Sequence, residues 1–323
     1  MSARLVEAFG IRIASAYPFR FHMRVVEGSP DLTFSLVDDP PLAPGWDATV
    51  PTFDVTRPDH HSDMLSQVVL VDGCVVARFE DAADFFLWDD RIVCHLKRPS
   101  LAHGVDIWFF GTVLALWLEL RGVPTLHAAS VVAGGRAIAF LATNKGGKST
   151  LALTLMQHGA RLLGDDQLPL ERSGDAVLAR PGYPQMRFWP DQAERLLAST
   201  DGLERVQPGS TKLRVPIGAA GFGAFAATPA PLAAIYVPER AARGTIDIAP
   251  VPLGEALTLL VRHSFLAGVG EALGLAPQRF RTFAAALRQA PLRRITYPSG
   301  IDRLDDVRAA VLDDVAGSAA PAT

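Results

Sequence analysis

The sequence predicts a mixed α/β protein in which an α/β core follows a β-rich N-terminal region. Two observations predict the core: a strand, a glycine-containing loop and a helix follow one another within 136–158, and a second strand ends in two aspartates at 165–166. A third observation concerns the N-terminal region, where Asp72-Gly73 separates two apolar runs and predicts a β-hairpin.

The N-terminal region, residues 1–104, is expected to form a β-rich domain. A second hairpin is expected where Asp89-Asp90 separates the apolar runs 85–88 and 92–94. The apolar segment 105–120 carries two acidic residues and falls short of the roughly 20 residues that cross a bilayer. We therefore expect it to form a buried helix, and we expect no membrane partner.

The loop at 142–150 nearly matches GxxxxGK[ST], the pattern whose backbone N–H groups surround nucleotide phosphates. Lys148 is expected to reach the β and γ phosphates, and the Ser149 hydroxyl to bind Mg²⁺. Ala142 stands where the pattern has its first glycine, so this turn must avoid the backbone angles that only glycine adopts at low cost. The residues expected to hold ATP and Mg²⁺ are Thr143, Asn144, Lys145, Gly146, Gly147, Lys148, Ser149 and Thr150.

Asp165 and Asp166 end a short apolar strand, 161–163. If this strand runs parallel to 137–141, a right-handed helical crossover fits between them, and both carboxyl ends meet at the ligand-binding edge of the sheet. One aspartate would bind Mg²⁺ beside Ser149, and the other would accept the proton of an attacking hydroxyl. The pattern does not assign the two roles. An isolated Asp-Asp pair is more often a solvated turn, but its position after a phosphate loop favours the functional interpretation.

Lys148 and Asp165 are separated by only seventeen residues, and this short spacing resembles the HPr kinase/phosphorylase family and its relatives, the ATP-dependent phosphoenolpyruvate carboxykinases. The segment 126–132 is similar to the His-containing strand that precedes the phosphate loop in HPr kinases. The resemblance covers 126–170, about one seventh of the chain. It implies an HPr-kinase/PEP-carboxykinase-like P-loop domain over 105–315. The composition of 316–323 itself predicts a disordered tail after this domain. The resemblance also implies that His127 lies near the catalytic aspartates, although a histidine on an apolar strand is often structural.

Downstream, 185–188 falls where HPr kinases carry a Glu-x-Arg-Gly signature, but Gln185 and Phe188 replace its first and last residues. This departure favours a kinase without the reverse, phosphorolytic activity. The segment 211–216 resembles the basic strand near substrate and phosphate in that family. The segment 292–298 resembles a closing segment of related kinases, including those that modify lasso-peptide precursors. Fixed positive charge stabilises a transferring phosphoryl group, so the expected phosphate clamps are Arg187, Lys212 and Arg214.

The functional hypothesis is an ATP-dependent kinase that phosphorylates a serine of a peptide or protein, with a lasso-peptide precursor favoured. Its expected catalytic residues are Asp166, Asp165, His127, Lys148, Arg187, Lys212 and Arg214. A small-molecule kinase or carboxykinase would use the same phosphate apparatus, and a nucleotide-gated peptide-binding module would use it without turnover. The resemblance also suggests a homo-oligomer. The choice between ATP and GTP stays open.

Composition excludes several other classes of function. The net charge of −3, from 31 basic and 34 acidic residues, creates no field that would attract nucleic acid. The chain has only two cysteines, which are too few for a disulfide framework and typical of a reducing cytoplasm. The first residues lack the apolar core of a signal peptide. We therefore expect a cytoplasmic protein.

Overall fold

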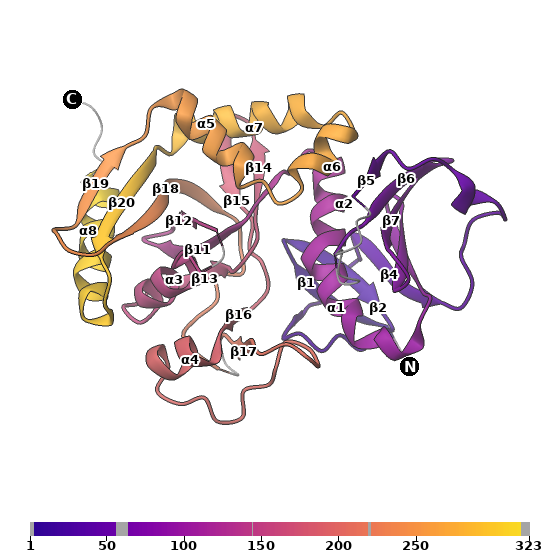
Figure 1. Cartoon of the computed structure of the whole chain (residues 1–323), viewed down its shortest axis with the longest axis horizontal. Helices are drawn as coiled ribbons and strands as arrows, with labels where there is room; N and C mark the ends of the chain where they lie inside the picture. The colour runs from indigo at the N-terminus through magenta and orange to yellow at the C-terminus, as the bar shows by residue number, and fades with distance from the viewer. Residues whose placement is uncertain (1–2, 56–63, 144, 219–220, 318–323) are drawn as a thin grey trace. The chain divides into compact units, whose positions relative to one another are not determined.

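The computed structural model describes residues 3–55, 64–143, 145–218 and 221–317, which form a mixed α/β protein with two large sheets (Figure 1). The chain divides into two compact units. The first comprises 1–122 together with 207–209 and 266–277, and the second comprises the remaining segments. This division falls after Gly122, whereas the sequence suggested a boundary after residue 104.

The first unit contains a nine-stranded sheet in the order β3-β1-β2-β4-β9-β8-β7-β6-β5. Most neighbouring strands are antiparallel, but β4 runs parallel to both β2 and β9. Both expected hairpins are confirmed, since β6 pairs with β7 and β8 pairs with β9 in antiparallel register. The strands are β1 (Arg4–Ala8), β2 (Ile11–Ser15), β3 (Arg24–Val25), β4 (Leu32–Val37), β5 (Phe53–Asp54), β6 (Gln67–Val71), β7 (Cys74–Phe79), β8 (Ala83–Leu87) and β9 (Arg91–Leu96).

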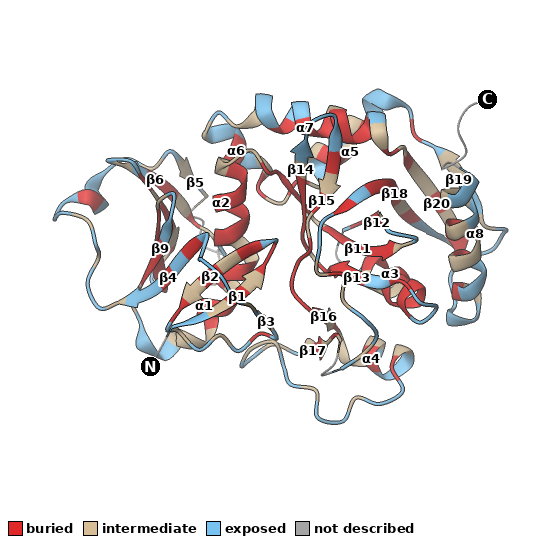
Figure 2. Cartoon of the chain, turned by 180° about the vertical axis from the view of Figure 1, so that it is seen from behind, coloured by how far each residue is buried: buried red, intermediate tan, exposed pale blue. Residues whose placement is uncertain are grey.

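A helical segment covers one face of this sheet and explains why the first unit extends to Gly122. Phe109 packs 4.2 Å from Phe34 between ring centroids, and Trp108 packs 5.5 Å from Phe79, so the segment shares its core with the sheet. The burial colours of Figure 2 show α2 almost wholly buried. The segment consists of η2 (Pro99–Gly104), α1 (Val105–Trp108), the π-helical turn η3 (Phe109–Val113) and α2 (Leu114–Leu120).

This segment is also the one helix among the described residues that is long and apolar enough to cross a membrane. It spans Pro99–Leu120, 22 residues, which is longer than the sequence suggested. About two thirds of its most apolar window, 67%, is buried inside the protein, and core helices of proteins without membrane spans pass the same test.

The second unit is built on a sheet in the order β10-β14-β15-β18-β12-β11-β13, with β20 adding to β18 and β19 adding to β20. A separate two-stranded ribbon joins β16 to β17. The strands are β10 (Thr125–Leu126), β11 (Ala128–Ala133), β12 (Arg136–Leu141), β13 (Arg161–Gly164), β14 (Leu168–Ser173), β15 (Ala176–Ala179), β16 (Gln185–Phe188), β17 (Leu213–Pro216), β18 (Ala230–Ala241), β19 (Asp247–Pro250) and β20 (Leu292–Pro298).

Helices lie on both faces of this sheet and give the second unit three layers. Along β12 the side chains alternate: Ala137, Ala139 and Leu141 join the core beneath α5 (Leu253–Arg262) and α7 (Ala276–Gln289). Ile138 and Phe140 join the opposite core, beneath α3 (Lys148–Met156) and α8 (Leu304–Gly317). Burial on both faces accounts for the nearly continuous apolar run of this strand.

The remaining helices lie in the C-terminal half of the chain. Helix α5 ends at Arg262, and a separate α6 (Ala267–Ala272) follows it. The last helix continues to Gly317, which corrects the start of the expected tail at 316, while 318–323 lie outside the described residues. Helix α4 (Pro190–Leu196) begins at a proline, a residue that is common at the first helical position.

Candidate functional site

Three segments that the sequence singled out meet at one edge of the second sheet. Strand β12 leads into the glycine loop, β13 leads into the aspartate pair, and β11 begins directly after His127. The register pairs Ala128 with Leu141 and Ser130 with Gly164, so the start of β11 lies beside the ends of both neighbours. The expectation that 137–141 and 161–163 present their carboxyl ends at one edge is therefore met.

The two parallel strands β12 and β13 are not neighbours in the sheet. Strand β13 is not bonded to β12, because β11 lies between them and is antiparallel to both. Two strands that are each antiparallel to a third share a direction, so β12 and β13 still run parallel to one another. The parallel partner bonded to β12 is β18.

The loop between β12 and α3 is tight, and its backbone explains the glycine positions. A Cβ on Gly146 would lie 2.5 Å from the Cβ of Ala142, which no real structure tolerates. Gly147 has φ +94° at the start of α3, and Lys145 has φ +64°. Ala142 is absent from the left-handed region, so the missing first glycine of the motif costs nothing here.

Lys148 is buried within this loop, with 5% of its surface exposed. Its ammonium donates to the carbonyl oxygens of Ala142 at 2.8 Å and Thr143 at 3.3 Å. Burial lowers its pKa, an effect that the charges of Asp166 and Asp165 oppose. The nitrogen also lies 3.1 Å from His127 Nε2.

His127 connects the lysine to the aspartate pair. Its Nδ1 lies 3.0 Å from the backbone oxygen of Asp166, which only accepts, so Nδ1 carries the proton. Because the Lys148 ammonium only donates, its contact with Nε2 gives that nitrogen the acceptor role. His127 therefore holds the turn at Asp166 and the lysine in fixed relative positions.

Asp165 is the more enclosed carboxylate of the pair, with 9% of its surface exposed. Its Oδ1 accepts from the Ser149 hydroxyl at 2.8 Å, and its Oδ2 accepts from the backbone N–H of Arg187 at 3.0 Å. Burial, together with the neighbouring charge of Asp166, raises the pKa of Asp165 to about 6. These contacts join the phosphate loop, the aspartate turn and β16 at one carboxyl group.

Asp166 adopts a left-handed backbone conformation, with φ +68°. Aspartate is among the few residues that tolerate this region, and such strain is common at functional sites. The preceding Gly164 permits the turn, since a Cβ there would lie 2.9 Å from the Gln167 carbonyl oxygen. The Asp166 side chain remains 26% exposed and lies 3.9 Å from the Arg187 guanidinium.

The pKa of Asp166 moves opposite to that of its neighbour. Burial alone would raise the pKa, but the positive charges around the carboxylate, above all that of Arg187, outweigh burial and lower the pKa below its usual value. Adjacent carboxylates thus receive different environments, one nearly enclosed and one facing cations. Opposite pKa shifts of two neighbouring carboxylates are common at functional sites where the two groups have different roles, such as metal binding and proton transfer.

A small pocket lies over the loop, and its walls carry several cations. It is lined by Lys145, Gly146, Gly147, Lys148, Ser149, Thr150, Asp166, Arg187, Trp189, Gln192 and Lys212. Trp189 has the ammonium groups of both Lys145 and Lys212 5.2 Å from a ring centroid. A polyphosphate in this pocket would meet positive charge from three separate segments of the chain.

Arg187 and Lys212 therefore lie where the sequence suggested, but Arg214 does not line the pocket. Arg214 lies opposite Arg187 in the β16–β17 ribbon and forms an ion pair with Glu204. Asn144 lies outside the described residues, and Thr143 takes part through its carbonyl oxygen.

The sequence did not reveal several residues at the site. The Tyr183 hydroxyl accepts from Arg187 Nη2 at 2.9 Å, and the ammonium groups of Lys145 and Lys212 both lie over the Trp189 ring. A Cβ on Gly147 would lie 3.0 Å from the Tyr297 hydroxyl and 3.2 Å from an Arg240 nitrogen, so both side chains reach the loop. Tyr297 belongs to the closing segment noted in the sequence, whereas Arg240 ends a long strand and carries no motif.

A second cavity, of about 320 Å³, adjoins the first because both are lined by Thr150 and Gln192. Arg240 and Tyr297 line it, together with residues of α4 and the turn after β20. This volume lies at the lower end of the range typical of small-molecule pockets.

Metal binding at this site would depend on a ligand from outside the chain. Among the described residues there is no group of three or more His, Cys, Asp or Glu side chains that could enclose a metal ion. The Ser149 hydroxyl and the two aspartates offer oxygen ligands only, which suits Mg²⁺ completed by phosphate oxygens and water.

Comparison with known proteins leaves the family open. No family model matches the chain, and no curated protein matches it. Among solved structures, the Hpr(Ser) kinase/phosphatase from Coxiella burnetii aligns at 11% identity and a TM-score of 0.30, covering 60% of this chain and 97% of that chain. At that identity and score, the likeness carries no argument about the activity of this protein. The functional argument therefore rests on the site itself.

Proposed function

We propose that this protein is an ATP-dependent kinase that transfers the γ-phosphoryl group to a serine hydroxyl of a peptide or protein. One observation supports this above all: hydrogen bonds connect Ser149 of the glycine loop to Asp165 and connect Lys148, through His127, to the backbone of Asp166. A phosphate cradle alone would suit nucleotide binding. The cradle with a cation-facing carboxylate beside it suits phosphoryl transfer.

In this proposal the triphosphate lies along the loop at the start of α3. The backbone N–H groups and the positive end of the helix dipole face the phosphates. Lys148 exchanges its contacts with the loop carbonyls for the β and γ phosphates. Arg240, Tyr297 and the adjoining cavity of about 320 Å³ then receive the nucleoside part.

Ser149 and Asp165 would hold Mg²⁺, since their oxygens are already 2.8 Å apart and Asp165 is fixed by a second hydrogen bond. Bound there, Mg²⁺ would neutralise charge on the phosphate oxygens. Proton competition is expected at Asp165 because its pKa is raised to about 6.

Asp166 is assigned as the base because it faces the pocket and remains ionised. The acceptor oxygen forms a bond to the γ phosphorus, the bond from that phosphorus to the bridging oxygen breaks, and ADP departs. The acceptor proton passes to Asp166. Arg187 and Lys212 stabilise the charge on the transferring group.

The acceptor class follows from the sequence resemblance, in which 292–298 is similar to kinases of lasso-peptide precursors. A peptide serine is therefore favoured over a small molecule. A small-molecule kinase would label a metabolite, and a binding module without turnover would label nothing.

The test uses γ-labelled ATP, candidate serine peptides and two variants. Lys148→Ala removes the phosphate contact and should abolish both ATP binding and transfer. Asp166→Asn should retain ATP binding in calorimetry and lose about 10²-fold or more in transfer rate, because base catalysis contributes on that order. Asp175→Asn, an exposed carboxylate in the β14–β15 turn, serves as the matched control. Normal transfer by Asp166→Asn would exclude the assigned base.

A further inference from the structure

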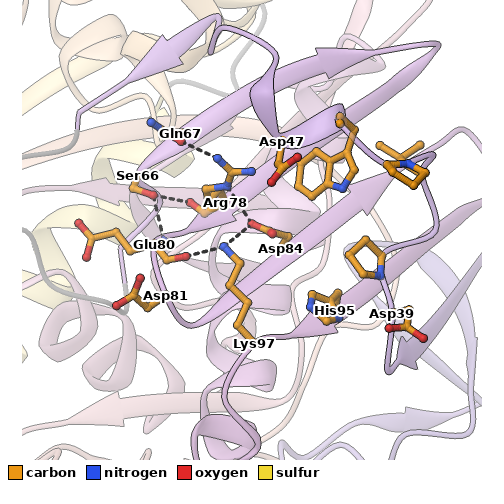
Figure 3. Close-up of a pocket in the computed structure, with 15 residues that line it drawn as sticks. Asp39, Asp47, Ser66, Gln67, Arg78, Glu80, Asp81, Asp84, His95 and Lys97 are labelled. Carbon is orange, nitrogen blue, oxygen red and sulfur yellow. Dashed lines mark hydrogen bonds and ion pairs between the residues drawn. The ribbon is translucent and has the colours of Figure 1, made fainter.

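The first unit contains a cavity of about 1030 Å³ on the face of its sheet opposite the helical segment (Figure 3). Phe79 and Phe85 point to the helical side, where both contact Trp108. Side chains alternate along a strand, so their neighbours Arg78 and Asp84 point to the other face and line the cavity. The proposed kinase chemistry does not use this cavity.

The floor of the cavity is a row of polar side chains that crosses four adjacent strands. Gln67 pairs with Arg78, Arg78 with Asp84, and Asp84 with His95, each directly opposite the next. Arg78 donates to Gln67 at 3.0 Å and to Asp84 at 3.1 Å. The central carboxylate is nearly enclosed, with 3% of its side chain exposed.

The two cations of the floor are already engaged. Figure 3 shows Asp84 between Arg78 and Lys97, and the Lys97 ammonium lies 2.9 Å from the same carboxylate oxygen that Arg78 contacts. Lys97 also donates to the Glu80 backbone oxygen at 2.6 Å. The guanidinium of Arg78 lies 5.1 Å from the Trp46 ring centroid. Floor cations held in this way attract an anionic ligand only weakly.

The rim of the cavity carries excess negative charge. Five carboxylates line the cavity against two cations, Arg78 and Lys97. Asp84 is engaged by both floor cations, and Asp81 forms an ion pair with Arg98. The other three carboxylates, which we call the rim acids, are Asp39, Asp47 and Glu80.

The wall beside the rim acids also offers apolar surface. Pro40, Leu42 and Pro44 line the cavity from the loop that precedes η1 (Trp46–Ala48). Lysine and arginine side chains combine a cationic end with a hydrocarbon stem, and the stem packs well against such a wall. The volume of about 1030 Å³ exceeds what one amine side chain fills, so a run of peptide fits better than a single small amine.

We propose that this cavity binds a lysine- or arginine-containing peptide segment, which, if the proposed kinase function holds, belongs to the peptide or protein acceptor. The rim acids supply the charge complementarity, and the floor row fixes the strands that carry them. Complementary charge determines specificity and association rate as well as affinity. The cavity therefore selects acceptors that carry a basic segment, and this segment is separate from the serine that is phosphorylated.

The test measures binding of fluorescein-labelled peptides to the full chain without nucleotide. Three peptides of equal length carry lysine and arginine, glutamate, or serine at alternate positions. The charge variant Asp39→Asn/Asp47→Asn/Glu80→Gln preserves shape, and the control Glu27→Gln/Asp72→Asn/Asp90→Asn removes as many exposed charges elsewhere in the same unit. Thermal unfolding of both triple variants verifies that each is folded.

We expect selective binding of the basic peptide, about tenfold weaker binding to the charge variant, and little change in the control. Added salt should weaken the wild-type complex. Retained peptide binding by Lys148→Ala would support the inference whether or not that variant binds ATP, which separates this inference from the kinase proposal. Equal binding of the three peptides, or equal affinity of the charge variant and wild type, would overturn it.

Discussion

At the scale of single residues, the two adjacent aspartates show how position divides one residue type into two functions. Asp165 has both oxygens occupied by hydrogen bonds and is nearly enclosed, so burial raises its pKa to about 6. Asp166 faces Arg187 and two lysines, which lower its pKa. The sequence predicted the pair, but it could not assign the roles, because each role depends on side chains that arrive from distant segments.

The raised pKa of Asp165 makes a prediction about stability. The folded protein binds this proton more tightly than the unfolded chain, whose carboxyl has an ordinary pKa near 3.8. Relative to Asp165→Asn, the wild type should therefore lose stability as pH rises from about 4 through about 6, and level off above that. The loss should be on the order of 1–3 kcal/mol. Urea unfolding of both proteins across this pH range, without Mg²⁺ or nucleotide, measures it; a constant difference would show that the pKa is not raised.

Residues that lie within one local motif were predictable, and residues gathered from elsewhere were not. Lys148, Ser149 and the glycines belong to a loop pattern whose backbone requirements are readable from sequence. Trp189 and Arg240 reach the loop only through the fold, and no spacing rule points to them. Arg214 was expected in the site by its order in the chain, but its partner is Glu204.

At the scale of elements, Trp189 connects the start of α4 to two lysines from separate loops. Each lysine lies near the aromatic ring, an arrangement worth about 0.5–1 kcal/mol at an exposed site. We interpret the tryptophan as a positioning residue, since it holds Lys145 and Lys212 where a polyphosphate would meet them.

Trp189→Leu should therefore weaken ATP binding about fivefold, while Trp189→Phe, which keeps an aromatic face, should weaken it less. Calorimetric titration of each variant with ATP and Mg²⁺ gives the two dissociation constants, and circular dichroism confirms the fold. Equal weakening by leucine and phenylalanine would indicate that packing, and not the aromatic face, determines the effect.

The strands and hairpins of the second sheet were largely predictable, but their order was not. The turn at Gly134-Gly135 and the strand after α3 follow from local patterns. The position of β11 between β12 and β13 depends on long-range strand pairing. The apolar runs of these strands are similar in composition, so their sequences do not indicate which strands pair.

At the scale of the whole molecule, the two units are not consecutive in the chain. The first unit takes residues 266–277 from a region otherwise belonging to the second. Within that unit, Gly268 of α6 lies against Phe53 of β5, with an added Cβ placed 3.4 Å from the ring. A boundary drawn from composition at residue 104 could not include this return of the chain.

This division predicts the behaviour of fragments. A fragment of residues 1–122 should unfold several degrees below a fragment in which a flexible linker joins it to 266–277, because the latter restores the contact of α6 with β5. Circular dichroism melts of the two fragments measure the difference. Equal midpoints would show that α6 adds nothing to the first unit.

The left-handed backbone at Asp166 restricts which substitutions report cleanly on its carboxylate. Alanine at this position would remove the charge and would also strain the backbone. Its side chain cannot form the local hydrogen bonds that help aspartate and asparagine to adopt a left-handed conformation. Asparagine shares the tolerance of aspartate for positive φ and removes only the charge. A lower transfer rate in Asp166→Ala would therefore combine the effect of a strained backbone with the effect of the lost carboxylate. Asp166→Asn reports the effect of the lost carboxylate alone.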